Sequence, residues 1–279
     1  MLDVIIEAIV DSLKALPFLF VAYLIIEFIE HKAKSKFTNA LAKSGKYGSF
    51  IGAALGAVPQ CGFSVMASNL YAGKVITMGT LIAVFISTSD EAIPILASNP
   101  DNFGVILLII GIKIVSAIVI GLLIDVIIKP KRDDDNADDF CASCHCHEKG
   151  GRVLVPAIIH TVKIFAFILV ITLVLDTIMF YIGEERIALL LGANRFIQPF
   201  ICALIGFIPN CAASVLLTDL FINGVVSFAG LTAGLCTGAG VGLAVLFQAN
   251  KGLKENVKII GILYVSGVVI GLITGIFVH

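Results

Sequence analysis

The hydrophobic positions of the chain form long apolar segments that are interrupted at a few short polar points. In the first 128 residues the pattern predicts helical pieces at 4–30, 32–46, 48–58, 62–72, 75–98 and 103–128. The pieces at 48–58 and 62–72 are each about 16 Å long as helices, about half of the hydrocarbon core of a bilayer. The break between them, Pro59–Gly62, therefore predicts a re-entrant hairpin, although one kinked spanning helix would fit the same pattern.

The same pattern of breaks occurs a second time, 150 residues later. Gly56–Ser64 aligns without a gap on Gly206–Ser214, and Gly56, Pro59, Cys61 and Ser64 are each matched by an identical residue. The last helices also match, because Gly111–Leu122 aligns on Gly261–Leu272. Two apolar segments would share leucine and valine by coincidence, but they would rarely share this set of residues in register. The match therefore indicates an internal repeat over nearly the whole chain.

Composition places these helices in a membrane. The chain is 58% hydrophobic and 14% charged, whereas a soluble domain has about 25% charged residues. The net charge of −1, without a basic patch, gives no indication of nucleic-acid binding. Asp3, Glu7 and Asp11 precede the first apolar segment, so we expect that segment to be a retained helix and not a cleaved signal peptide.

These patterns predict an all-α polytopic membrane protein built from two inverted-topology repeats. The predicted units are a first repeat at 1–128, a hydrophilic linker at 129–152 and a second repeat at 153–279. Each repeat is expected to have three spanning helices, one of them broken, and one re-entrant helical hairpin. Three is an odd number, so the second repeat would enter the membrane upside down.

The distribution of basic residues supports the inversion and predicts an orientation. Lys74 and the segments 32–46, 129–152 and 250–258 hold fourteen of the nineteen Lys and Arg residues. Basic loops face the cytoplasm. We therefore expect a multi-pass protein of the plasma (inner) membrane, with the linker in the cytoplasm and both termini outside.

Polar residues gather at the breaks, where transporters with broken helices and inverted repeats bind their substrates. The candidate substrate-binding residues are Gln60, Cys61, Ser64, Ser87, Thr88, Ser89, Asn210, Cys211, Ser214 and Thr237. Other roles stay open: the prolines could only kink helices, the amides could satisfy freed backbone, and the serines could bond their own helices. The repeat cysteines could be small apolar fillers. Cys202 and Cys236 have no counterpart in the repeat, and we expect them to be packing residues.

Three ionisable residues are candidates for a coupling site, since charges within membrane segments are costly and mark function. Asp90 and Glu91 interrupt the segment at 75–98, and Lys113 lies in the helix at 103–128. The alternative is that the two carboxylates lie in a wet loop after Ser87. Thr88 and Glu91 also have the spacing of a capping box, which predicts the start of a half-helix there.

The linker carries a cluster of soft ligands, Cys141, Cys144, His145, Cys146 and His147. Thiolates and imidazoles favour zinc, copper(I) and similar ions, and thiolates also bond trivalent metalloids. The cluster could be a cytoplasmic metal or metalloid site, or a linker in which the cysteines are incidental. We expect no cofactor to be required.

The motifs Ala57–Ser64, Ser87–Glu91 and Pro209–Ser214 resemble the ten-helix (10TM) heavy-metal exporter family, whose members are named as arsenic efflux proteins or manganese transporters. The resemblance implies export of a small inorganic ion across the lipid bilayer, and no enzymatic activity. The architecture is also similar to ion transporters with paired hairpins, many of which are homodimers, so a homodimer is a further expectation.

The leading hypothesis is a secondary-active exporter of a metalloid or heavy metal such as arsenite, bound at the midplane between the repeats. The alternative is an inorganic oxyanion, phosphate or arsenate, bound at half-helix N-termini. A divalent cation such as manganese is the third substrate class. A channel and, as a different class, a membrane thiol oxidoreductase that uses Cys141 and Cys144 are further possibilities.

Overall fold

The computed structural model describes residues 48–57, 61–88, 92–97, 103–128, 196–209 and 211–277, with the single positions 20, 158, 162, 165, 166, 169, 170 and 173. Its first-half helices are α2 (Gly48–Gly56), α3 (Cys61–Ala72), α4 (Met78–Ser87), α5 (Ala92–Ala97) and α6 (Phe103–Ile127). Its second-half helices are α10 (Gln198–Ile205), α11 (Cys211–Ile222), α12 (Phe228–Thr237), α13 (Val241–Ala249) and α14 (Leu253–Phe277). Within the described ranges the regular structure is all helical.

The helices predicted at 48–58, 62–72 and 103–128 are present as α2, α3 and α6, with ends within two residues of the prediction. The predicted interruption of 75–98 is also present, because α4 ends at Ser87 and α5 begins at Ala92. The predictions at 4–30 and 32–46 lie outside the described residues, apart from Phe20.

The predicted capping role of Thr88 is wrong. Thr88 is the C-cap of α4, and its backbone N–H donates to the carbonyl oxygen of Val84. Its hydroxyl also donates to that oxygen, at 2.7 Å. A threonine that closes the end of one helix in this way does not begin the next, and α5 begins four residues later, at Ala92.

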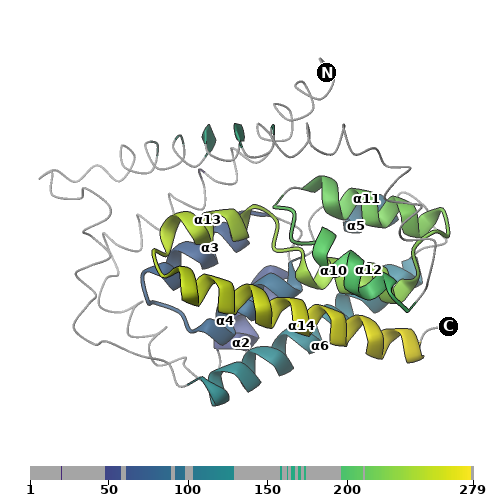
Figure 1. Cartoon of the computed structure of the whole chain (residues 1–279), viewed down its shortest axis with the longest axis horizontal. Coiled ribbons are helices and arrows are strands. Elements are labelled where there is room, and N and C mark those ends of the chain that lie inside the picture. The colour runs from purple at the N-terminus through teal and green to yellow at the C-terminus, as the bar shows by residue number, and fades with distance from the viewer. Residues whose placement is uncertain are drawn as a thin grey trace, which may run out of the picture.

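The two halves have the same internal packing. In the first half α4 packs against α2, α3 and α6, and in the second half α12 packs against α10, α11 and α14. The halves also exchange contacts, because α3 lies along α13 and α5 lies beside α11 (Figure 1). Each half therefore supplies the partner for a helix of the other half, and neither forms its packing alone.

The central helices begin at equivalent caps. Thr77 is the N-cap of α4 and Ser227 is the N-cap of α12, and each hydroxyl accepts the backbone N–H three residues later. The support around the caps differs, since the Asp125 carboxylate accepts from the hydroxyl of Thr77 at 2.9 Å. In the second half the Gln198 side-chain oxygen accepts from the backbone N–H of Ser227 at 2.8 Å. The start of each helix is thus fixed by a hydroxyl and by a polar side chain from a neighbouring helix.

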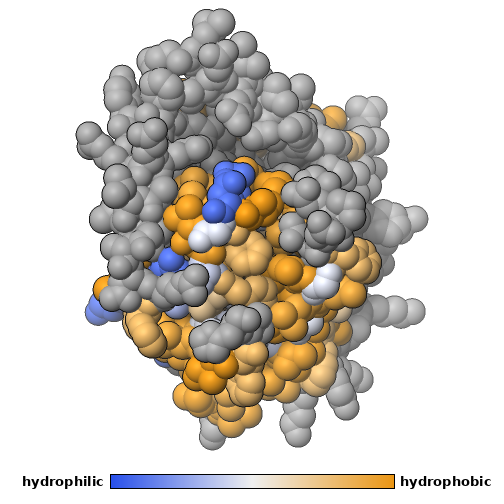
Figure 2. Space-filling model, turned by 90° about the vertical axis from the view of Figure 1, so that its right-hand side faces the viewer, coloured by the Kyte–Doolittle hydropathy of each residue, from blue (hydrophilic) through white to orange (hydrophobic). Residues whose placement is uncertain are grey.

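Burial separates central helices from outer ones. Every residue of α4 is buried. The α12–α13 segment, Phe228–Ala249, is long and apolar enough to cross a membrane, and 89% of the residues in an 18-residue apolar window of it are buried. In the corresponding windows of the other two such helices in the described ranges, α6 and α14, only 28% and 39% of the residues are buried. Their exposed valine, leucine and isoleucine side chains belong to a largely hydrophobic surface, and Figure 2 shows such a surface on one face. Such a surface faces lipid in a membrane protein.

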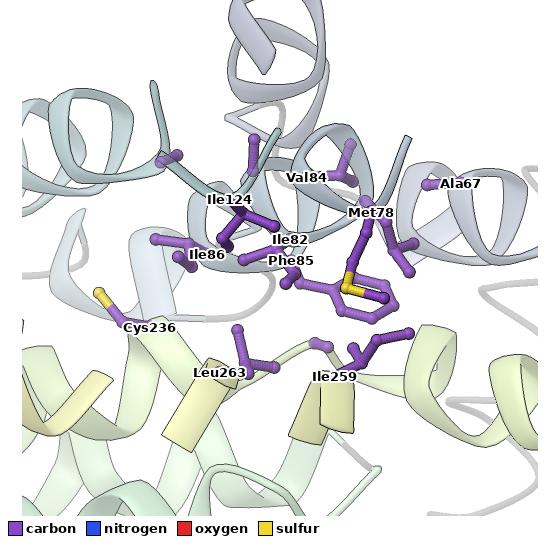
Figure 3. Packing of buried hydrophobic residues seen from close by; sticks show 14 of the residues in the cluster. Ala67, Met78, Ile82, Val84, Phe85, Ile86, Ile124, Cys236, Ile259 and Leu263 are labelled. Carbon is purple, nitrogen blue, oxygen red and sulfur yellow. The ribbon is translucent and has the colours of Figure 1, made fainter. Parts of the chain in front are cut away.

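The main hydrophobic cluster joins the two halves. Phe85 and Met78 of α4 belong to the same cluster as Ile259 and Leu263 of α14, which lie across from them in Figure 3. Phe85 and Leu263 are both fully buried. Because this cluster contains side chains from both halves, the halves share hydrophobic core packing.

Equivalent turns follow α3 and α11. Lys74 and Gly224 both have positive φ, 56° and 75°, and the next residue in each turn donates its N–H to the carbonyl oxygen five residues earlier, at 2.9 Å. This is the left-handed helix cap that favours glycine. Lysine in the first half shows that the turn tolerates a side chain at some cost.

We expect Gly224→Ala to lower the free energy of unfolding by about 1 kcal/mol, because a residue with a Cβ is disfavoured in the left-handed region. No atom lies within 4 Å of the position that the new Cβ would take, so the cost is conformational only. Thermal unfolding in detergent measures it. Gly261→Ala is the matched control, since that helical position is equally open and alanine favours helix. Equal destabilisation by both changes would contradict the prediction.

Candidate functional site

The site is built around the breaks in the two central helices. In the second half α12 ends at Thr237 and α13 begins at Val241. Gly240, between them, has φ 53° and ψ −144°, a conformation that residues with a side chain rarely adopt. In the first half the corresponding break follows Thr88. Both breaks free backbone groups in the interior of a membrane protein, where such groups must be buried in protein or line a cavity.

A small cavity of about 20 Å³, enough for one water molecule, lies at the break of α12. Thr88 is its one first-half lining residue among the described positions, and Ser214 lines it from the first turn of α11. The remaining lining residues come from α11, α12 and the segments that follow α10 and α12: Gly206, Ile208, Ala213, Leu217, Gly234, Leu235, Gly238 and Gly240. Two predicted substrate-binding residues from different halves are therefore brought to one cavity.

The Lys113 ammonium lies next to this cavity. Its side chain is 1% exposed, and its Nζ donates to the carbonyl oxygen of Thr88 and, at 2.6 Å, to that of Leu235. The carbonyl of Leu235 would ordinarily accept from the N–H of Ala239, but that N–H donates to Thr237 instead. Lys113 thus occupies a position between the C-terminal ends of α4 and α12, where the partial charge is negative.

Ser64 lies at the contact between α3 and α13. It is fully buried, and a Cβ on Gly242 would lie 2.6 Å from the Ser64 Cβ, so only glycine allows this approach. The neighbouring Ser68 hydroxyl donates to the carbonyl oxygen of Gly242 at 2.7 Å and to that of Ser64 at 2.9 Å. Ser68 and Gly242 were not among the predicted site residues. The one available signal was the hydroxyl that Thr218 supplies at the position equivalent to Ser68.

Ser87 and Thr237 lie at equivalent helix contacts. The Ser87 hydroxyl donates to the carbonyl oxygen of Ala83 at 2.8 Å. The Thr237 hydroxyl reaches the carbonyl oxygen of Ala203 in α10, also at 2.8 Å. The close approach of the helices depends on Gly56 and Gly206, since a Cβ on Gly56 would meet Ser87 and one on Gly206 would meet Thr237. In this structure the two hydroxyls donate to the protein backbone, and their role toward a substrate stays a prediction.

Several predicted site residues are outside the described ranges. They are Gln60, Ser89, Asp90, Glu91, Asn210 and the linker residues Cys141, Cys144, His145, Cys146 and His147. Cys61 and Cys211 are the first residues of α3 and α11. Where the chain is described, no group of three or more His, Cys, Asp or Glu residues could hold a metal ion.

Cys202 and Cys236 are both fully buried and belong to hydrophobic clusters. Their placement confirms the expectation that they are packing residues.

A family model described as "Putative, 10TM heavy-metal exporter" matches residues 1–180. The chain belongs to this family. The match spans the first half, the linker and the beginning of the second half, so it includes the break of α4 and Lys113. None of the curated proteins and none of the solved structures matches the chain. Because it belongs to this ten-helix family, the protein is a multi-pass membrane protein, and the family supports the export of heavy metal in general.

Proposed function

We propose that the exporter is a secondary transporter whose site lies where its two halves meet, and that its substrate is a metalloid such as arsenite. The observation that carries this proposal is the cavity that brings Thr88 of the first half to Ser214 of the second. It lies at the break of the most buried of the three membrane-length apolar segments in the described ranges. Transporters with internal repeats bind their substrates at such breaks.

Inverted repeats are part of the proposal, and the pattern of contacts supports them. Helix α3 of the first half lies along α13 of the second, and α11 of the second lies beside α5 of the first. This reciprocal exchange is what a two-fold pseudosymmetry axis between the halves would produce. The alternation of basic loops along the sequence favours an axis in the membrane plane. We include the re-entrant hairpins, the cytoplasmic linker, the external termini, the plasma (inner) membrane and the homodimer in the same proposal.

The metalloid hypothesis rests on the thiols that begin two helices of the site. Cys61 and Cys211 are the first residues of α3 and α11, at equivalent places in the repeat. Ser214 lies three residues after Cys211 and lines the cavity. A trivalent metalloid bonds thiolates, and its hydroxyl groups can hydrogen-bond to serine and threonine. The thiol-rich linker at Cys141–His147 would then capture the metalloid in the cytoplasm.

An oxyanion such as phosphate or arsenate is the second candidate, and a specific observation favours it. The cavity adjoins the first turn of α11, where Ala213 and Ser214 line it. A helix N-terminus carries partial positive charge and free N–H groups, which attract anions. The same charge disfavours a divalent cation such as manganese, which stays the third candidate.

The coupling step is assigned to Asp90, Glu91 and Lys113. Lys113 bonds the carbonyl oxygen of Thr88, and Asp90 follows Thr88 by two residues. A carboxylate so close along the chain to a buried ammonium can exchange a proton or an ion partner as the site opens. Such exchange would link movement of the substrate to an ion gradient.

Uptake into proteoliposomes tests the function, with arsenite, phosphate and Mn²⁺ offered in parallel, with and without a pH gradient. For a metalloid substrate, Cys61→Ser and Cys211→Ser should each lower arsenite transport at least about tenfold, or about 1.4 kcal/mol of binding. Cys202→Ala is the control, since the thiol of this buried cysteine packs against Gly230 and Cys202 is not among the residues that line the cavity. Phosphate transport that survives both cysteine changes and is lost in Ser214→Ala would replace the metalloid by the oxyanion.

A further inference from the structure

We propose that Lys113 is a tethered cation: its ammonium fills a place where the backbone would otherwise bind an alkali ion such as Na⁺. The consequence of this inference for transport rests on the proposed function, whereas its consequence for the stability of the protein does not. On this inference, the exporter moves its substrate without an alkali co-ion, because the cation is part of the chain.

The place that Lys113 occupies is formed by backbone oxygen atoms at helix ends. Thr88 is the C-cap of α4, and Leu235 lies in the last turn of α12. The ammonium bonds the carbonyl oxygens of both. Unwound carbonyls and half-helix C-terminal ends are the groups that coordinate Na⁺ in transporters with broken helices. The ammonium therefore has the partners that an alkali ion would have.

Further oxygen atoms lie around the same helix end. A Cβ placed on Gly238 would lie 3.3 Å from the carbonyl oxygen of Gly234, 3.6 Å from that of Leu235 and 3.7 Å from that of Gly206. The last of these belongs to the end of α10, so two helices direct carbonyl oxygens at one small region. Hard cations prefer oxygen ligands such as these carbonyl groups. The region beside the ammonium can thus accommodate a free ion if the ammonium is removed.

The second half lacks this arrangement. The residue equivalent to Lys113 is Leu263, which is fully buried in the hydrophobic cluster that Figure 3 shows. The residues equivalent to Asp90 and Glu91 are Gly240 and Val241. The lysine and the two carboxylates therefore occur together in one half and are replaced together in the other. This is the pattern of a charge-balanced cation site, whereas a lysine that only capped helix ends would not need the carboxylates.

Thermal unfolding of Lys113→Ala tests the inference without any substrate. The variant is compared in NaCl, KCl and choline chloride at equal ionic strength. Removal of the side chain leaves the carbonyl oxygens without their cation, so Na⁺ or K⁺ should bind there and raise the melting temperature as its concentration rises. Choline is too large for the place and should not raise it. The matched control is Leu263→Ala, which opens a buried space at the equivalent position where the side chain carried no charge.

Stabilisation of Lys113→Ala by Na⁺ or K⁺, with no such effect on Leu263→Ala, is the expected result. Equal responses of the two variants, or no response of Lys113→Ala, would overturn the inference and leave Lys113 as a helix cap. If Lys113→Ala does not fold in any salt, the melting temperature of the wild-type protein in the different salts tests the inference. The wild-type protein should melt at the same temperature in NaCl and choline chloride, and specific stabilisation by Na⁺ would show that the place is not filled. These results do not depend on the identity of the exported solute, so the proposed function can fail or stand separately.

Discussion

Gly206→Ala is expected to lower the free energy of unfolding by about 3 kcal/mol, near the upper end of the usual cost of overpacking a buried contact. The new Cβ would lie 2.2 Å from the carbonyl oxygen of Gly234 and 2.3 Å from the Thr237 hydroxyl oxygen. The first of these atoms is backbone and cannot rotate away. Helix α10 would therefore have to separate from α12, and the hydrogen bond from Thr237 to Ala203 would be lost with the contact.

Thermal and denaturant unfolding of the purified exporter in detergent would measure this effect. Gly56→Ala, the equivalent change in the first half, should act in the same direction, because its Cβ would lie 2.5 Å from the carbonyl oxygen of Val84. Gly111→Ala is the control, since no atom lies within 4 Å of its new Cβ. A Gly206→Ala protein as stable as Gly111→Ala would mean that the helices do not pack this closely.

The helices of the first half could be predicted because their signals are local. An apolar segment of fixed length and a Pro-Gly break are read from adjacent residues, and α2, α3 and α6 end within two residues of the prediction. The equivalence of Gly56 and Gly206 was visible in the sequence, because both occupy the same position in the repeat. Its physical reason, a helix contact that excludes a Cβ, involves residues about thirty positions away and became visible only in the structure.

Contacts between the halves could not be predicted, because nothing in a local pattern states which distant segments meet. The hydrogen bond from Ser68 to Gly242 joins residues 174 positions apart. The meeting of Thr88 with Ser214 at the cavity is equally non-local. Residue types alone identified hydroxyls, thiols and amides at the breaks, but they did not separate those that line the cavity from those that hold helices together.

Lys113 was conspicuous in the sequence as a charge in an otherwise apolar helix, and such a charge indicates function. The sequence grouped it with the carboxylates Asp90 and Glu91 as candidates for one coupling site. The structure adds the carbonyl oxygens of Thr88 and Leu235. Backbone acceptors have no sequence signal, since every residue carries one and only the fold decides which ones lose their helical partner.

Gly240→Ala is expected to reduce transport about a hundredfold. Gly240 has φ 53° and ψ −144°, a backbone conformation that is accessible almost only to glycine, and holding another residue there costs about 1–3 kcal/mol. The chain would relieve this strain by changing the angle at which α13 leaves the break. Gly240 also lines the cavity, so the same change would move the wall of the proposed site.

The control for this prediction must separate the effect of backbone strain from the effect of a change in the cavity wall. Gly224→Ala also places a side chain at positive φ, but Gly224 lies in the turn after α11, and it is not among the residues that line the cavity. Transport by both variants would be measured in proteoliposomes at matched amounts of folded protein. Gly224→Ala should transport as well as the wild type once it is folded. If Gly240→Ala did so too, the break would not form the transport site, because a site whose wall has been moved by the strained residue cannot keep its affinity.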